Sequence, residues 1–429
     1  MKKSLMRAAM VACLPFCAMA LTVATAPAQA ADKAKADVPK ISKSVMKQLT
    51  DCKKAIDAKD YATAIAKCTE AKNTPDTTDW DKYVTDRYLG VAYFGTGDRA
   101  KAEEAFYSVL KNPTCPQEDK DNLTVPAMSL ASDKNDYARV IELGQMAIKS
   151  PVNNPDVYGT LAGAYYSTND TVNALLYANK GIELATTQNK MPQYGLYQIV
   201  TFSYDKLKDR PNELKGFELM VRDYGKAEDW RYLLDLSLEF LPAGNKSMRE
   251  IAALDMYRLR MIIDAAWQPS NYLEAADAAH AVRSWGDART VLQMGIAKGV
   301  IDAKKVAPLL AQTNADAKKD EPILPTIENS AKDSKSLSTV AEAYYGYGRY
   351  ADAARVAQKA INAGGAFAAE AKMVLAMSQV RLGNEAAAKQ TLADFQGDPA
   401  ITRAAQLWNV YLNRRYGAAA PAAAPAPAH

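Results

Sequence analysis

The sequence has 429 residues, of which 48% are hydrophobic and 24% are charged. Its 53 lysines and arginines are nearly balanced by 49 aspartates and glutamates, so the charge gives no electrostatic case for binding nucleic acid or an anionic membrane. With only two histidines, the chain also has few of the side chains on which catalytic triads and zinc sites depend.

The first thirty residues have the pattern of a secretory signal. Three basic residues lie within the first seven positions, an apolar stretch follows from 8 to 23, and Ala28-Gln29-Ala30 forms a small-x-small cleavage site. We therefore expect a signal peptide at 1–30, cleavage after Ala30 and export of the remainder. A membrane anchor is the alternative, and a proline within the apolar stretch disfavours it. No later stretch is apolar for long enough to cross a bilayer, so no membrane span is expected in the mature chain.

Pairs of small-residue helices then recur every 34 to 38 residues. Glycine or alanine at the eighth and twentieth positions of a pair lets the two helices approach closely, and large residues beside them fill the remaining space. Five such units are expected at 45–224, after a flexible segment at 31–44. The clearest unit contains Leu89, Gly90, Tyr93, Gly97, Asp98, Ala102, Phe106 and Pro113.

The pattern weakens over residues 225–330, where degenerate helical repeats are expected. A polar stretch from Gln312 to Pro322 is expected to be a surface loop, or a break that acts as a hinge between two blocks. Clear units return at 331–416, and a final helix at about 402–416 should cap the end of the stack, because a terminal repeat has no neighbour to cover its apolar face. Residues 417–429 are almost only alanine and proline and are expected to be disordered or extended.

This spacing resembles the tetratricopeptide repeat: a Leu-Gly-x-x-Tyr run, nine residues to an alanine, and four more to an aromatic residue. The resemblance covers most of 45–396. It implies an all-α fold, a right-handed α-solenoid of about eight stacked helix-turn-helix units with a C-terminal capping helix. No alternating apolar and polar run indicates a sheet. The arrangement also resembles exported tetratricopeptide proteins of Gram-negative bacteria, which implies a periplasmic or secreted location.

In this family, side chains of the first helix of each unit line a concave groove that binds a partner. Transferring those positions to this sequence gives Arg87, Phe94, Tyr166, Gln198, Phe202, Glu342, Tyr345, Met373 and Met377. Aromatic and methionine side chains on such a surface favour recognition of an apolar or helical protein segment. Tyr166 and Tyr345 in particular have the alternative of packing against the next repeat.

Three cysteines lie beyond the signal, at positions 52, 68 and 115. Disulfides persist in the compartments that exported proteins reach. The resemblance places Cys52 on the first helix and Cys68 on the second helix of one pair, at facing positions, so a Cys52–Cys68 bridge is one interpretation, with Cys115 left over. The other is that all three are small buried residues that replace alanine.

The sequence does not mark an active site. A triad or metal centre would have to use His280, and no pattern of acidic residues marks a ligand set around it. Dinucleotide, phosphate and calcium motifs are absent, so we expect no catalysis, no cofactor and no metal.

Three hypotheses about function remain. The first is an exported scaffold that grips a protein or peptide partner in cell-envelope assembly or transport. The second is a binding module for a glycan or peptidoglycan strand, and the third is a passive spacer. Phenylalanine, methionine and single charges at the groove positions favour the first, because a glycan site would be expected to have tryptophan there.

Overall fold

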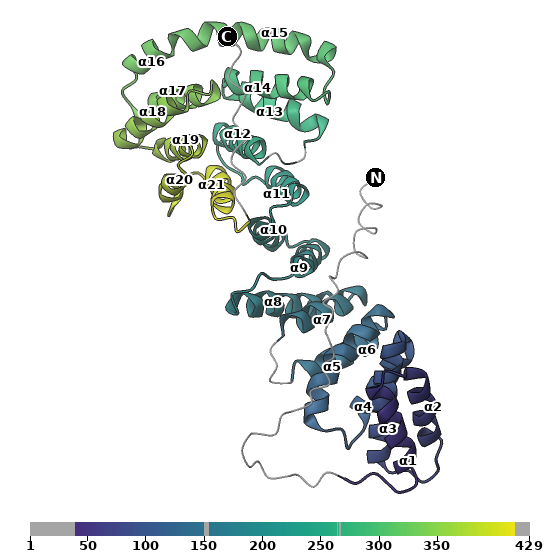
Figure 1. Ribbon diagram of the computed structural model, residues 1–429. Coiled ribbons are helices and arrows are strands. Elements are labelled where there is room, and N and C mark those ends of the chain that lie inside the picture. Colours follow the sequence, from purple (N-terminus) through teal and green to yellow (C-terminus); the bar gives the residue numbers. More distant parts are fainter. Residues whose placement is uncertain (1–38, 150–153, 264, 266, 417–429) are drawn as a thin grey trace.

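The computed structural model describes residues 39–149, 154–263, 265 and 267–416. Over these residues the chain forms twenty-one α-helices and one 3-10 helix, and it contains no strand (Figure 1). The expectation of an all-α fold is confirmed. None of the helices within those ranges is both long and apolar enough to cross a membrane. The expected signal with its cleavage site after Ala30, and the tail at 417–429, lie outside the described residues.

The first ten helices pack in sequential pairs, and each pair stacks on the next. They are α1 (Met46–Asp57), α2 (Tyr61–Lys72), α3 (Asp79–Thr96), α4 (Arg99–Lys111), α5 (Gln117–Asp133), α6 (Tyr137–Ala147), α7 (Pro155–Ser167), α8 (Thr171–Thr187), α9 (Tyr194–Leu207) and α10 (Arg210–Tyr224).

The later elements continue the array around a curve (Figure 1). They are α11 (Ala227–Glu239), α12 (Lys246–Ile262), α13 (Pro269–Ala281), α14 (Trp285–Ala297), α15 (Ala303–Asp320), η1 (Glu321–Ile323), α16 (Leu324–Ser330), α17 (Ser334–Gly346), α18 (Tyr350–Ala363), α19 (Ala368–Arg381), α20 (Glu385–Leu392) and α21 (Pro399–Leu412).

A recurring turn separates the two helices of each early pair. The last residue of the turn is an aspartate whose carboxylate accepts a hydrogen bond from the third backbone N–H of the second helix, at Asp60, Asp98, Asp136, Asp170 and Asp209. The residue before each aspartate has a positive φ; these residues are Lys59, Gly97, Asn135, Asn169 and Lys208. The turn therefore reverses the chain in few residues and satisfies one orphan N–H of the next helix.

Small residues let the paired helices approach closely. A Cβ added to Gly90 on α3 would lie 2.5 Å from the ring of Phe106 on α4. Phe106 itself is fully buried. The glycine and the phenylalanine of the clearest repeat therefore fit each other across the pair, as the sequence pattern predicts.

Buried apolar residues form two large clusters along the array. One extends from α1 to α9, and the other runs from α9 through α12 to α21. A smaller cluster joins α12, α13, α14 and the start of α15. The core is thus spread along the stack, as a solenoid requires.

The polar stretch from Gln312 to Pro322 is not a loop or a break, which corrects the expectation. Residues up to Asp320 continue α15, and η1 follows directly. Only Val306, Thr313 and Ala317 of α15 are buried. The stretch is polar because a helix on the outside of the array buries one narrow face and exposes the others.

The last helix, α21, covers α20 at the end of the stack and also reaches back to α10 and α12 (Figure 1). Trp408 is fully buried, and its indole N–H donates to the backbone oxygen of Asp255 at 3.0 Å. Arg403 donates to the hydroxyl of Ser237 at 2.9 Å. The curved array from α10 to α20 is therefore closed on itself by α21, a contact that the sequence did not indicate.

A disulfide joins the two helices of the first pair. It connects Cys52 on α1 with Cys68 on α2, whose Cα atoms lie 5.5 Å apart. Both cysteines are fully buried. Cys115 is a free, buried thiol, and burial raises its pKa.

Candidate partner-binding surface

Two phenylalanines on first helices remain outside the hydrophobic clusters. Phe94, near the end of α3, is 37% exposed. Phe202, in the middle of α9, is half-buried and belongs to neither of the two large clusters. An apolar ring that the fold does not use for its own core is available to a partner.

Three other predicted residues lie on the same set of first helices. Tyr166 on α7 is half-buried, and the Lys206 ammonium lies 3.9 Å from the centre of its ring. Arg87 on α3 forms an ion pair of 2.6 Å with Asp119 on α5, so it also ties two repeats together. Gln198 on α9 is half-buried. We call Arg87, Phe94, Tyr166, Gln198 and Phe202 the first-helix surface.

Two glycines keep the backbone of these helices uncovered. A Cβ added to Gly163 on α7 or to Gly195 on α9 would meet no atom within 4 Å. By contrast, a Cβ on Gly159 would lie 2.7 Å from the side-chain oxygen of Gln193. Open space over a helical glycine lets another chain approach the backbone closely.

The four remaining predicted groove residues do not line an open groove, and this corrects the prediction. Met373 and Met377 on α19 are fully buried, Tyr345 on α17 is 5% exposed, and all three belong to the cluster that includes α21. Glu342 on α17 is largely buried and paired with Arg258 at 2.7 Å. The physical reason is that Arg258 on α12 covers Glu342 and Tyr345, while α21 packs against both α12 and α19.

The centre of this closed part holds a buried charge cluster that the sequence did not reveal. The Arg258 guanidinium is fully buried and lies 2.9 Å from Asp255, 2.7 Å from Asp287 and 2.7 Å from Glu342. It also lies over the ring of Tyr345, 4.5 Å from its centre. Burial, with the charge of Glu342 beside it, raises the pKa of the Asp255 carboxyl well above its usual range.

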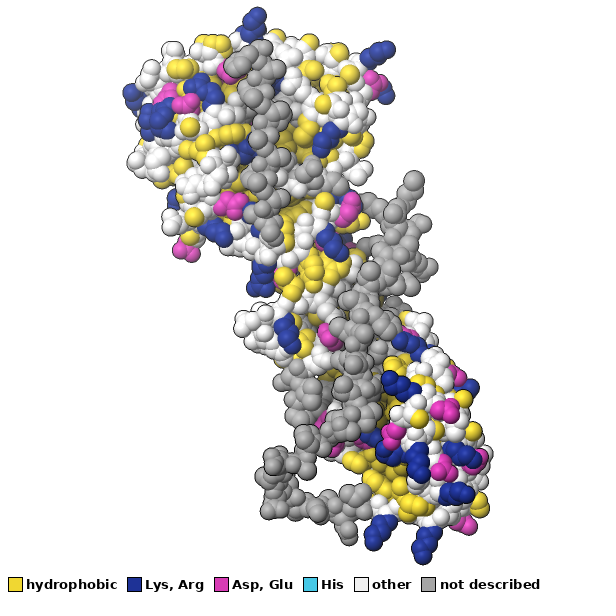
Figure 2. All heavy atoms as spheres, viewed as in Figure 1, with side chains coloured by type: hydrophobic (Ala, Val, Ile, Leu, Met, Phe, Trp, Pro, Cys, Tyr) yellow, Lys and Arg dark blue, Asp and Glu magenta, His cyan; other side chains and the backbone are white. Residues whose placement is uncertain are grey.

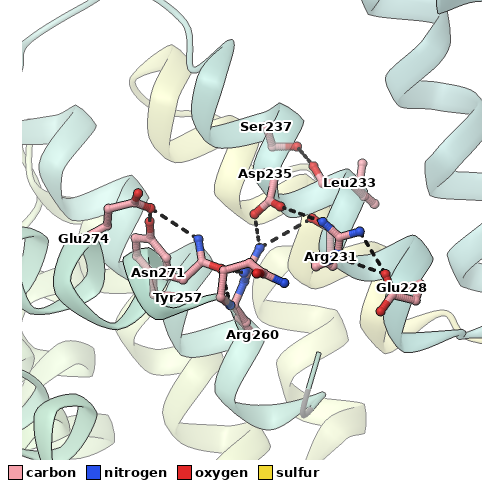
Figure 3. Close-up of polar contacts among 10 residues, drawn as sticks. Glu228, Arg231, Leu233, Asp235, Ser237, Tyr257, Arg260, Asn271 and Glu274 are labelled. Atoms are coloured by element: carbon pink, nitrogen blue, oxygen red, sulfur yellow. Dashed lines mark hydrogen bonds and ion pairs between the residues drawn. The ribbon is translucent and has the colours of Figure 1, made fainter. Parts of the chain in front are cut away.

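A second polar network joins α11, α12 and α13 (Figure 3). Arg260 on α12 is fully buried and donates to Asn271 at 2.6 Å and to Asp235. Asn271 in turn donates to Glu274, which also accepts the hydroxyl proton of Tyr257 at 2.8 Å. These bonds join α11, α12 and α13 in the part of the chain where the repeat pattern is weakest.

Comparisons with known proteins find fold-level likeness only. No protein-family model matches the sequence, and no curated protein matches it. A tetratricopeptide repeat protein from Parabacteroides merdae ATCC 43184 is 12% identical, with 79% of this chain and 100% of that chain covered and a TM-score of 0.29. The P58(IPK) TPR domain is 11% identical. The match covers 86% of this chain and 98% of that domain, with a TM-score of 0.22. A chain of the Cut9–Hcn1 hetero-tetramer of the APC/C is 13% identical. The match covers 87% of this chain and 71% of that chain, with a TM-score of 0.23.

TM-scores this low do not establish a shared fold. The fold is therefore identified from the repeats of this chain. Its paired helices begin again at aspartate caps 34 to 39 residues apart, and each unit has a small residue where its helices meet. The fold is a tetratricopeptide-type α-solenoid. Within it, the first-helix surface belongs to the repeats before α10. Helix α21 packs against α10, α12, α19 and α20.

The tetratricopeptide-type array does not bring catalytic groups together around His280. Its ring nitrogen Nε2 lies 2.9 Å from the Thr313 hydroxyl on α15, and the ring packs edge-on to Trp285. In the parts of the chain that the structure describes, no group of three or more histidine, cysteine or acidic residues is placed to hold a metal ion. His280 therefore acts here as a packing residue between α13 and α15.

Proposed function

We propose that the protein is an exported, non-catalytic scaffold that binds a protein or peptide partner along its first-helix surface. The observation that carries this proposal is the exposure of Phe94 together with the position of Phe202 outside both large hydrophobic clusters. Gly163 on α7 and Gly195 on α9 leave room above these first helices for the backbone of another chain. Aromatic rings beside open backbone suit an apolar or helical protein segment.

Export is supported by the Cys52–Cys68 disulfide, because such bonds persist in oxidising compartments and are rare in reducing ones. The signal pattern at 1–30 and the resemblance to exported tetratricopeptide proteins agree with it. We therefore propose a periplasmic or extracellular location, with a role in cell-envelope assembly or transport.

The test is a cross-linking capture from intact cells that naturally produce the protein. The native chain is compared with a Phe94→Ala, Phe202→Ala double variant and with a matched control, Tyr232→Ala with Phe240→Ala. The control removes two rings, one on α11 and one directly after it, that are 46% and 43% exposed. Figure 2 shows hydrophobic side chains gathered over α9 to α11. We expect one protein to be enriched by the native chain and the control and lost from the first variant, with unchanged helicity.

Other outcomes contradict the proposal in distinct ways. Loss of the partner from the control alone would move the site to the exposed rings of α11, away from Phe94 and Phe202. A large loss of stability in the Phe94→Ala, Phe202→Ala variant would show that these rings belong to the core. No specific protein in any sample would favour a glycan ligand or a passive spacer.

A further inference from the structure

A hollow of about 490 Å³ lies where α15 and η1 pass over the junction of α14 with α17 and α18. At this junction α14 and α17 touch closely, because a Cβ on Gly286 would lie 2.3 Å from the backbone oxygen of Gly346. The hollow is lined by Arg289 from α14, Lys318 from α15, and Arg349 at the start of α18. Pro322 and Pro325 form part of its wall.

The lining of this hollow is predominantly cationic. Against its three basic side chains it has one carboxylate, Glu321, which lies 3.9 Å from Arg289 and so beyond hydrogen-bond distance. The side chain of Asn314 adds an amide group. Asp352, next to the hollow, accepts hydrogen bonds from Nε and Nη2 of Arg349 at 2.9 and 2.7 Å and leaves the Nη1 side of that guanidinium for another partner.

Both guanidinium groups are held in place by aromatic rings. Arg349 lies over Tyr344, 4.4 Å from the ring centre, and Arg289 lies over Tyr347 at 5.8 Å. Tyr347 is itself fixed by its hydrogen bond to Asp320 at 2.9 Å. A guanidinium that is already oriented loses little conformational entropy when it binds an anion. Anion binding in the hollow is therefore favoured by this prior orientation.

The sequence departs from its own repeat at this point. Five earlier turns place a left-handed residue before a capping aspartate, as Gly97 stands before Asp98. The turn before α18 keeps the left-handed glycine, Gly348, but Arg349 occupies the position of the aspartate and forms no capping hydrogen bond. A cation thus replaces an anion beside the positive end of the helix. Asp352, in the first turn of α18, pairs with it on one side only.

We propose that this hollow binds a small anion that carries at least two negative charges, as a phosphoryl compound or a polycarboxylate does. Two preoriented guanidinium groups and one ammonium group match the oxygens of such a ligand. This site lies away from the first-helix surface and goes beyond the proposed function, so the two can be tested separately.

The test is isothermal titration of the full chain with inorganic pyrophosphate and, separately, with citrate, with chloride as the monovalent reference. We expect saturable binding of at least one of the two polyanions and none of chloride. In a variant with Arg289→Gln and Arg349→Gln, binding should weaken by at least about tenfold, which is the loss of one or two charge-assisted hydrogen bonds. Binding of pyrophosphate alone would identify a phosphoryl site, and binding of citrate alone would identify a polycarboxylate site.

Two further variants keep the result interpretable. Lys318→Glu changes an exposed side chain of the lining, so it should weaken binding without a folding defect. Lys319→Gln removes the neighbouring exposed charge, which is not part of the lining, and should leave affinity within about twofold. The proposal fails if neither polyanion binds the native chain at concentrations up to about 10 mM. Equal binding by the native chain and Lys318→Glu would overturn it as well.

Discussion

Tyrosine outnumbers phenylalanine by 23 to 8, and at several positions its hydroxyl ties one repeat to the next. The hydroxyl of Tyr107 donates to Glu142 at 2.6 Å, and the two residues are 35 positions apart. Tyr194 donates to Asp229 at 2.9 Å, also 35 positions later. Because this separation equals about one repeat, each hydroxyl forms its bond with the following unit. Phenylalanine could supply only the packing.

The buried carboxylates around Arg258 lead to a prediction about pH. Burial raises the pKa of Asp255, so the folded chain holds this proton more tightly than the unfolded chain does. Stability from this group is therefore present below the unfolded pKa of about 3.9 and is lost as pH rises toward the folded pKa. Asp255→Asn mimics the protonated form and should increase the free energy of unfolding at pH 7. The gain should vanish near pH 4 in urea unfolding followed by circular dichroism.

The matched variant at this cluster is Arg258→Met. It leaves Asp255, Asp287 and Glu342 buried without their shared cation, so it should cost about 3–5 kcal/mol at pH 7. An Asp255→Asn protein that is less stable than the native chain at pH 7 would show instead that Asp255 is ionised and that its pairing with Arg258 outweighs its burial.

At the scale of single elements, the first helix pair depends on its disulfide. The bridge joins residues 16 positions apart, and closing a loop of this length stabilises the folded state by about 3 kcal/mol. Replacing both Cys52 and Cys68 by alanine should therefore destabilise α1 and α2 by about that amount. Hydrogen exchange should show the loss of protection in these two helices first, because a terminal repeat has only one neighbour.

Two controls accompany the disulfide variant. Reducing the native chain with dithiothreitol should reproduce its exchange pattern. Cys115→Ala removes a buried thiol that forms no bridge, so protection of α1 and α2 should remain as in the native chain. If α1 and α2 keep full protection after reduction, packing alone holds the first pair together.

The helix pairs were predictable because their signals are local. Gly90 and Phe106 lie within one repeat. In the turn between their helices, Gly97 is the left-handed residue and the adjacent Asp98 is the helix cap. The sequence of α15 did not predict a helix, because its polar composition is also typical of a loop. Only the helical spacing of the buried residues Val306, Thr313 and Ala317 distinguishes it from a loop. Composition alone does not separate an exposed helix from a loop.

The candidate surface was predictable only where the array stays open. Phe94 is exposed and Phe202 half-buried, whereas Met373 and Met377 are fully buried. Their burial depends on contacts of α21 with helices much earlier in the chain, such as the bond from Trp408 to Asp255, which spans 153 positions. A repeat pattern reports on helices that are adjacent in sequence. It does not predict a contact between helices as far apart in the chain as α12 and α21.

For the whole molecule, these contacts divide the stack into an open part and a closed part. In α1–α9 each pair relies mainly on adjacent pairs, as in a linear solenoid. From α10 onward, α21 adds contacts between helices far apart in the chain, and Arg403 supports it through Ser237 and an ion pair with Glu218. The closed part should therefore unfold as one cooperative unit, while the open part loses protection pair by pair.

Trp408→Ala tests this division. The ring is fully buried between α21 and α12, so its loss should cost about 3–5 kcal/mol within the closed part. Hydrogen exchange should rise together across α10–α20 and stay unchanged in α1–α8. Gln406→Ala, an exposed change on the same helix, should alter stability by less than about 0.5 kcal/mol. If exchange in the Trp408→Ala protein rises only in α21 and α20, then α21 is a simple end cap and the closure does not stabilise the repeats that it joins.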